Sequence, residues 1–241
     1  MSATTHTRRI KFLVALMALT LLPACIYAPK FSTTKLNGAA GRPKALVMPV
    51  DVMLFEISMG GLEEPKAAWT ESARHNIEQS LDRALRDLNI STVNYAPPNR
   101  DAGKKDGRRD QLLKLLGVIG SSIYRHYYES VNHLPAKKEF AWSLGGATRI
   151  LRDEYGADYA LFIYMRDRFS SGGRVALGVV TSALFGYIPQ AGQQEGLAYL
   201  VDLHSGDVVW FHFLKSGGFG DAREPAQART AIDALLVEFP K

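Results

Sequence analysis

Residues 157–169, ADYALFIYMRDRF, carry the strongest strand signal in the chain and decide its fold. The stretch opens as an unbroken apolar run and alternates from Met165 to Phe169. An unbroken run is typical of a strand buried on both faces, and alternation is typical of a strand with one exposed face. The pattern therefore predicts a strand at the centre of a sheet, with one end emerging from the core.

A helical pattern precedes this strand. Residues 140–155 repeat apolar side chains at helical spacing, which predicts a helix. Gly145 and Gly146 weaken its first half, because glycine costs up to about 1 kcal/mol against alanine in a helix. Gly156 stands where a helix commonly ends in a left-handed residue.

The residues after the central strand predict a hairpin and a closing helix. Residues 195–203 and 207–214 are rich in strand formers, and Gly206 lies in the turn between them. Residues 216–221, SGGFGD, form a glycine loop that lacks the Gly-Lys-Ser/Thr ending of a phosphate loop. Pro225 opens a helix predicted to run to residue 239, since proline suits the first helical turn.

The N-terminal half predicts a strand, a helix, a strand and a second helix. Residues 44–57 are a mostly apolar strand, and Pro49 predicts a bulge or an early end within it because proline donates no ladder hydrogen bond. Residues 65–88 carry one apolar stripe and predict the clearest helix. A short strand over 90–95 follows, and then a helix over 110–128 whose inward side chains are predicted to be Leu112, Leu116, Ile119 and Ile123.

Residues 174–189, RVALGVVTSALFGYIP, leave two interpretations open. In the first, residues 174–181 form the return strand of a hairpin. In the second, residues 181–187 form a short apolar helix. The stretch is short for a membrane span, which needs about 20 residues. It is either core strand and buried loop, or a surface that contacts a membrane or a second subunit.

The first residues are typical of a secretory signal. Three basic residues (Arg8, Arg9 and Lys11) precede the apolar run 12–22, and Ala24 precedes Cys25. Eleven helical residues rise about 1.5 Å each, too little to cross a hydrocarbon core of about 30 Å. We therefore expect a cleaved signal rather than a permanent membrane helix.

The ending Leu22-Pro23-Ala24-Cys25 resembles the bacterial lipobox, although Pro23 departs from the small residue usual there. The resemblance implies that Cys25 is acylated and that the chain is cut before it. Several acyl chains hold a protein stably on a membrane. Ile26, rather than an aspartate, follows the cysteine, which by resemblance favours the periplasmic face of the outer membrane. We expect a signal peptide over 1–24, lipidated cysteine and flexible tether over 25–43, and a single α/β domain over 44–241.

Composition narrows the classes of partner. The chain carries a net charge of +5, and removal of the basic signal leaves about +2, which argues against nucleic acid. Residues 99–109, NRDAGKKDGRR, are interpreted as a solvated basic loop, with contact to anionic headgroups as the alternative. Cys25 is the one cysteine of the chain, so the fold is expected to be stable without disulfides.

The second half of the chain resembles a group of bacterial envelope lipoproteins. The motif GADYAL, residues 156–161, enters the central strand, and LVDLHSGDVVW, residues 200–210, spans the hairpin turn. Both resemble motifs of the group that includes the curli-secretion channel lipoprotein and the amino-terminal domain of TolB. The resemblance implies a single sandwich domain with helices packed on a mixed β-sheet. A pore is not favoured, because residues 174–189 lack the long alternation of a barrel strand.

No catalytic, metal or cofactor signature stands out. The histidines are scattered, and the predicted hairpin brings only His204 and His212 near one another. Asp153, Glu154, Asp158 and Asp167 gather around the central strand, but a glycosidase needs two carboxylates across a cleft. Asp202 and Asp207 are interpreted as turn residues, and Trp210 as a core residue rather than a platform for a ligand. We assign no catalytic residue and expect no cofactor.

These patterns predict a lipid-anchored envelope protein that is not an enzyme. The first hypothesis is an accessory or assembly factor for an envelope complex, anchored to the bilayer through acylated Cys25 and bound to a protein partner. The alternative is an oligomeric secretion or transport component, a homo-oligomer included, that contacts membrane or neighbours through 174–189. An envelope hydrolase is the third hypothesis, and it requires converging carboxylates or a Ser–His pair.

Overall fold

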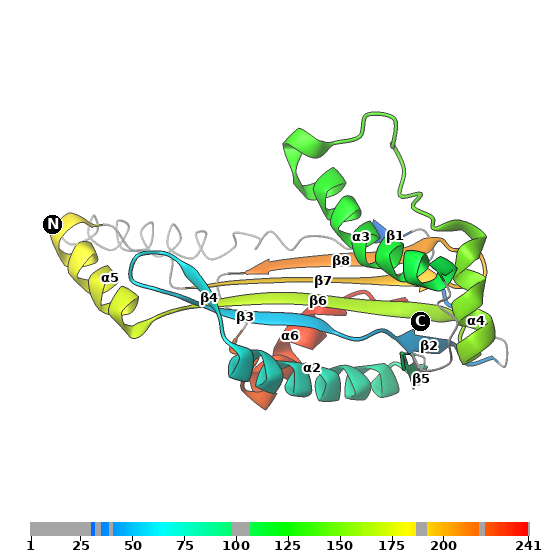
Figure 1. Ribbon diagram of the computed structural model, residues 1–241, viewed down its shortest axis with the longest axis horizontal. Coiled ribbons are helices and arrows are strands. Elements are labelled where there is room, and N and C mark those ends of the chain that lie inside the picture. The colour runs from blue at the N-terminus through cyan, green and yellow to red at the C-terminus, as the bar shows by residue number, and fades with distance from the viewer. Residues whose placement is uncertain are drawn as a thin grey trace, which may run out of the picture.

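The computed structural model describes residues 30–31, 35–38, 41–97, 107–186, 192–216 and 220–240. It is a mixed β-sheet with helices on both faces (Figure 1). The elements are β1 (Lys30–Phe31), β2 (Lys44–Val47), β3 (Asp51–Ile57), β4 (Glu63–Pro65), α2 (Ala67–Asp87), β5 (Ser91–Asn94), α3 (Gly107–Tyr128), the 3-10 helices η3 (Ser130–Asn132) and η4 (Gly145–Thr148), α4 (Arg149–Tyr155), β6 (Tyr159–Ser170), α5 (Gly172–Phe185), β7 (Gly192–Asp202), β8 (Val208–Ser216) and α6 (Pro225–Leu235). The predicted α/β sandwich is confirmed.

Strand β6 is the centre of the sheet, as the sequence predicts. The strand order is β1-β8-β7-β6-β2-β5, and β3 pairs with β6 and carries β4 on its other side. Strands β2 and β3 run parallel to β6, whereas β7 is antiparallel to it along eleven residue pairs. Helices connect the parallel strands, as such crossovers require.

A bulge divides the predicted first strand at Pro49, confirming the prediction. From Val47 to Asp51 the chain advances four residues while its partner β6 advances three, from Leu161 to Tyr164. The extra residue reverses which side chains face which layer. Leu46 and Met48 belong to one core cluster, whereas Val52 and Leu54 belong to the other.

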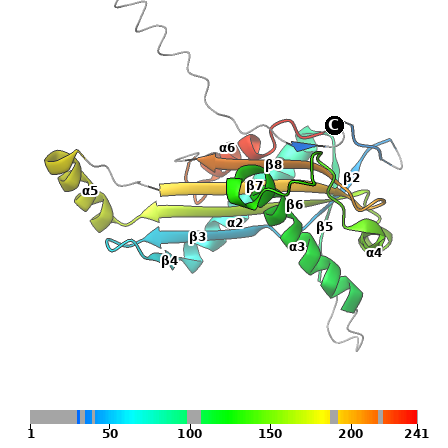
Figure 2. The same ribbon diagram turned by 90° about the horizontal axis from the view of Figure 1, so that it is seen from above.

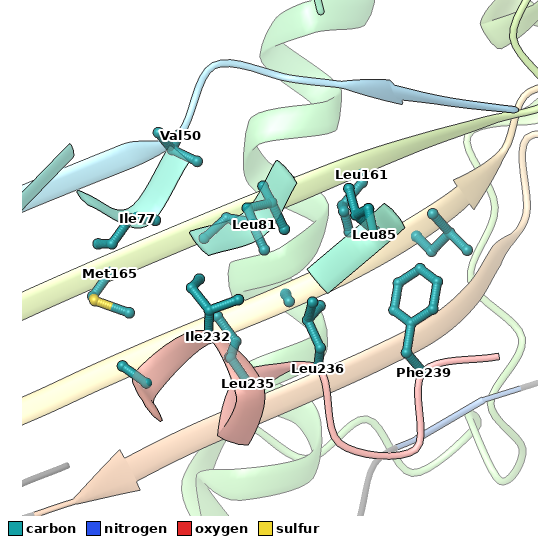
Figure 3. Close-up of a cluster of buried hydrophobic side chains, with 14 of the residues drawn as sticks. Val50, Ile77, Leu81, Leu85, Leu161, Met165, Ile232, Leu235, Leu236 and Phe239 are labelled. Carbon is teal, nitrogen blue, oxygen red and sulfur yellow. The ribbon is translucent and has the colours of Figure 1, made fainter. Parts of the chain in front are cut away.

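One face of the sheet is covered by α2 and α6. Figure 3 shows apolar side chains of both helices turned toward the strands: Ile77, Leu81, Leu85, Ile232, Leu235, with Leu161 and Met165 on β6. Burial of a leucine or isoleucine side chain stabilises a fold by about 1.5–3 kcal/mol. Trp210 on β8 packs edge-on against Phe239, with ring centroids 4.9 Å apart, so the tryptophan of the hairpin motif is a core residue.

The other face is covered in part by α3 and α4. The residues predicted to face inward from α3 are buried, namely Leu112, Leu116, Ile119 and Ile123. Leu151 of α4 joins the same cluster. Figure 2 shows α3 running at an angle to the strands, so it covers only one part of this sheet face.

Three predicted boundaries are wrong. The helix predicted over 140–155 forms only from residue 145, because residues 142–144 bond to the hairpin instead: Val208 N–H donates to Trp142 O (2.8 Å) and Leu144 N–H to Gly206 O (2.9 Å). Helix α3 starts at Gly107, inside the predicted basic loop, of which residues 99–106 lie outside the described residues. The last helix ends at Leu235 rather than residue 239.

The described part of the stretch 174–189, residues 174–186, forms neither the predicted return strand nor a buried loop; the alternative of a helix is correct, although the helix begins earlier than predicted. Residues 172–185 are the helix α5, and the return strand is β7. Ser171 caps the helix by accepting the Arg174 N–H (3.3 Å), and Gly186 ends it in the left-handed conformation. None of its side chains is buried. Residues 187–191 lie outside the described residues.

Candidate functional site

The predicted lipidation site, Cys25, lies outside the described residues, and so do residues 1–24. Parts of the predicted tether are described, and they differ from a free linker. Lys30 and Phe31 pair with β8, Leu36 packs against the core, and the Asn37 N–H donates to Tyr159 Oη (2.9 Å). These contacts attach at least this part of residues 25–43 to the domain.

A cleft of about 530 Å³ lies between α3 and the part of the sheet that α3 leaves open. Its helical wall includes Leu113, Gly117 and Tyr124 of α3. Its floor includes Phe162 of β6 and Phe213 of β8. Ligand sites typically have 300–1,000 Å³ and mostly apolar, aromatic linings with a few polar groups. The cleft therefore has the size and lining of a binding site.

Two local features shape the cleft. The bulge around Pro49 contributes Met48, Pro49 and Asp51 to one end of it. On α3, Gly120 allows close contact with the sheet, because a Cβ there would lie 2.6 Å from the Tyr199 ring. The Tyr199 hydroxyl is buried and donates to Leu116 O on the same helix, and burial raises its pKa.

Charged residues of both signs continue from the cleft along the sheet. Arg166 pairs with Asp51 (2.8 Å) and lies over the Tyr164 ring, with its guanidinium carbon 4.0 Å from the centroid. Glu195 is 3.4 Å from both Arg168 and Lys215. Because the opposite charges in these ion pairs neutralise one another, this surface suits a partner of mixed polarity rather than a strongly charged one.

The carboxylates singled out from the sequence do not converge. Glu154 pairs with Arg109 (2.7 Å), and Asp158 accepts the Lys44 N–H (3.0 Å). Asp158 and Asp167 are nine residues apart along one extended segment, about 30 Å at the usual strand rise. Asp202 accepts the N–H groups of residues 204 and 205, so its predicted turn role is confirmed.

Asp167 is a buried carboxyl group on the α6 side of the sheet, away from the cleft. It is 3% exposed, and its carboxylate accepts a hydrogen bond from Gln194 Nε2 (2.9 Å). Desolvation by burial raises its pKa to about 6, and the nearby Asp221 carboxylate acts in the same direction.

The histidines that meet are not the pair suggested by the hairpin. His126 and His133 stack with ring centroids 4.6 Å apart, whereas His212 is buried with Nδ1 2.8 Å from Leu235 O. His126 Nδ1 accepts the Leu134 N–H (2.9 Å), and Nε2 lies 3.2 Å from Lys137 O, so both ring nitrogens hold the segment after α3. Within the described ranges no three His, Cys, Asp or Glu side chains gather as a metal site would require.

Helix α5 projects beyond the ends of the strands in both views (Figures 1 and 2). Three of its apolar side chains are exposed by about two thirds or more: Val179 by 66%, Leu184 by 68% and Phe185 by 79%. Across the described part of the chain, no helix combines the length and the apolar character needed to cross a membrane.

Sequence reasoning missed the cleft because its residues come from five separate elements. The strand prediction for β6 places Phe162 and Tyr164 on one face, because alternate residues of a strand share a face. The gap above them depends on the angle of α3, which no local pattern encodes. Arg109 was also missed: it is buried, pairs with Glu154, and its guanidinium lies 5.7 Å from the Tyr95 ring centroid.

The described residues define a three-layer α/β domain with an aromatic cleft and an exposed apolar helix. No protein-family model matches the chain, and no curated protein matches it.

Solved structures with a similar fold include bacterial proteins of low sequence identity. One is a variant PelC dodecamer from Paraburkholderia phytofirmans, with TM-score 0.39, 14% identity and coverage of 88% of this chain and 97% of that chain. Another is lipoprotein GNA1162 from Neisseria meningitidis, with TM-score 0.33, 12% identity and coverage of 81% and 96%. The C-terminal domain of LpoB from Salmonella enterica has TM-score 0.26, 10% identity and coverage of 71% and 81%. Likeness at this level carries no argument about the fold or the function of this chain.

Proposed function

We propose that this protein is a lipoprotein anchored to the periplasmic face of the outer membrane, where it acts as a non-enzymatic accessory or assembly factor for an envelope complex. The observation that carries the proposal is the run of eleven apolar residues, 12–22, followed by Ala24 and Cys25. Acyl chains on Cys25 hold the protein on the bilayer, since each buried methylene contributes about 0.8 kcal/mol. The α/β domain then faces the periplasm.

The variant Cys25→Ala tests the anchor. Cells expressing the full chain are labelled with palmitate and fractionated. The intact protein should incorporate label and sediment with membranes, whereas the variant should incorporate none. A variant that still carries label refutes lipidation at Cys25.

The choice of membrane rests on the residue after the cysteine. Density-gradient separation should place the intact protein with the outer membrane. The variant Ile26→Asp should shift it toward the inner membrane, and an unchanged distribution would contradict the sorting argument.

The cleft is the place we propose for the protein partner, because it combines a volume of about 530 Å³ with an aromatic lining. A photo-reactive amino acid at Ser121, which lines the cleft, should give cross-links to one envelope protein. The matched control is Ser72, an exposed serine on α2, whose helix covers the opposite sheet face. Equal cross-linking from both positions would refute partner binding in the cleft.

A second candidate function is an oligomeric secretion or transport component that uses residues 174–189. The exposed apolar helix α5 favours it. The native mass of the lipidated protein in mild detergent should then be that of a large ring or assembly, and deletion of 174–189 should reduce it. A monomeric mass for the intact protein would exclude the oligomeric component and leave the accessory factor as the proposed function.

A further inference from the structure

We infer that α5, together with the β3–β4 turn, contacts the same lipid bilayer that holds the acyl chains of Cys25. The inference rests on the proposed lipid anchor, and it adds a second point of attachment at a defined place on the domain. It follows from the composition of α5, from the turn beside it, and from the direction in which the chain approaches Cys25.

The apolar side chains of α5 need to be shielded from water, and the described part of the domain does not bury them. At about 100° per residue, its apolar side chains fall on all sides of the helix rather than along one stripe. A helix that is apolar all round is normally buried in a core or in a membrane. Yet none of its side chains is buried, and it has no acidic residue; Arg174, at its start, is its one charged residue.

The β3–β4 turn extends this apolar surface. Met59 is 62% exposed and Leu62 is 72% exposed. The turn lies against the start of α5, since a Cβ added at Gly173 would be 3.9 Å from Met59 Cβ. The acidic Glu63 that follows is neutralised by Arg168, at 2.8 Å.

The direction of β1 points the chain that precedes it toward the same end of the sheet. Strands β1 and β8 are antiparallel, so the N-terminal side of Lys30 faces the end at which β8 and β6 finish and α5 begins. Lys30 pairs with Phe211 of β8, which pairs with Tyr199 of β7, which in turn pairs with Phe162 of β6, so Lys30 lies at the level of Phe162 along the sheet. From Phe162, β6 continues for eight residues to Ser170, a distance of about 26 Å. Five residues separate Cys25 from Lys30 and reach at most about 17 Å.

The acyl chains can therefore enter a bilayer within about 10 Å of the level where α5 starts. A bilayer covers a helix from several sides at once, whereas one neighbouring protein covers one face. At about 21 Å, a helix of 14 residues is too short to cross the core, so α5 is placed in the headgroup and upper acyl region.

A reporter on α5 tests this placement. The intact lipidated protein has no free thiol, because its one cysteine is acylated under the proposed function. Phe185→Cys therefore accepts a single polarity-sensitive fluorophore, and Val131→Cys, at a 92% exposed valine after α3, is the matched control. Both proteins are placed in vesicles of phosphatidylethanolamine and phosphatidylglycerol.

The fluorophore at position 185 should emit at shorter wavelength than in water, should be protected from quenching by iodide, and should be quenched by nitroxide-labelled lipids. The control fluorophore at position 131 should keep the emission wavelength it has in water and should be quenched by iodide. Adding Leu184→Glu should raise iodide quenching at position 185 by about fivefold or more, because a charge is costly in hydrocarbon.

Each contrary result has its own meaning. A position-185 reporter that is open to iodide on vesicle-bound protein overturns the inference and leaves the anchor standing. A reporter shielded from iodide but untouched by lipid nitroxides indicates a second copy over α5 and also overturns it. Protein that does not sediment with vesicles at all overturns both the anchor and the lipid contact of α5.

Discussion

Replacing Asp167 with asparagine is expected to stabilise the protein at neutral pH. Burial raises the pKa of Asp167 from an ordinary 3.8 to about 6, so the folded state binds the proton more tightly than the unfolded state. Hydrogen bonds from Gln194 and from backbone N–H groups lower the pKa, but desolvation outweighs them. Keeping this carboxylate charged therefore costs folding free energy.

The size of the cost follows from the shift. One pKa unit corresponds to about 1.36 kcal/mol, so a shift of about two units costs about 3 kcal/mol above pH 7. The cost fades as the pH falls through 6 and is gone below about 4, where both states are protonated. The neutral variant avoids it, and Gln194 Oε1, which is buried without a hydrogen-bond partner, is available to its amide group.

Urea unfolding at pH 4.5, 6 and 7.5 measures the effect through tryptophan fluorescence. Asp167→Asn should gain up to about 3 kcal/mol at pH 7.5 and progressively less at lower pH. Asp221→Asn is the control with the opposite sign: burial raises the pKa of Asp221, but its hydrogen bonds with Arg223 outweigh this and lower it. That variant should lose stability at pH 7.5. A gain for Asp167→Asn that is absent, or independent of pH, would refute the reasoning.

Three further predictions test the packing. Gly120→Ala should destabilise by about 1–3 kcal/mol, because its Cβ would lie 2.6 Å from a tyrosine ring carbon, whereas Gly117→Ala on the same helix meets nothing within 4 Å and should gain up to about 1 kcal/mol; equal urea midpoints would contradict this. Arg109→Met should lower the free energy of unfolding by about 1–2 kcal/mol, a figure discounted because Glu154 is partly exposed. The fall in thermal midpoint relative to the parent should be smaller in high salt, which screens the Arg109–Glu154 pair. Gly206→Ala should cost about 2–3 kcal/mol, since φ is +86° and a Cβ would clash with backbone; a variant as heat-stable as the parent excludes this.

Much of the fold was readable because its elements have strong local periods. The stripe of α2, the inward side chains of α3, the central strand and the hairpin turn were predicted and are confirmed. Errors arose where long-range contacts override local preference. Residues 142–144 would extend a helix, but they bond to the hairpin, and Gly145 takes a left-handed conformation there.

Residues 174–189 show the limit of pattern reading most clearly. Their β-branched, apolar composition suits a strand or a helix, and apolar character alone suggests burial. The structure makes residues 172–185 a capped helix outside the core, because β6 already has β7, β2 and β3 along its edges and leaves no pairing position for another strand. The candidate site likewise depends on how α3 crosses the sheet, where Gly120 lies close to the ring of Tyr199.

The sequence by itself determined the α/β class, the central strand, the burial of Trp210 in the hairpin motif's strand and the expectation of a lipid anchor at Cys25, because each rests on a local pattern of side chains. Only the tertiary structure decided that the Pro49 bulge reverses the faces of the first strand, that Asp167 is desolvated, and that α5 is left exposed. These features depend on which segments meet across the sheet, and the free energy of such contacts is a property of paired surfaces rather than of either segment alone.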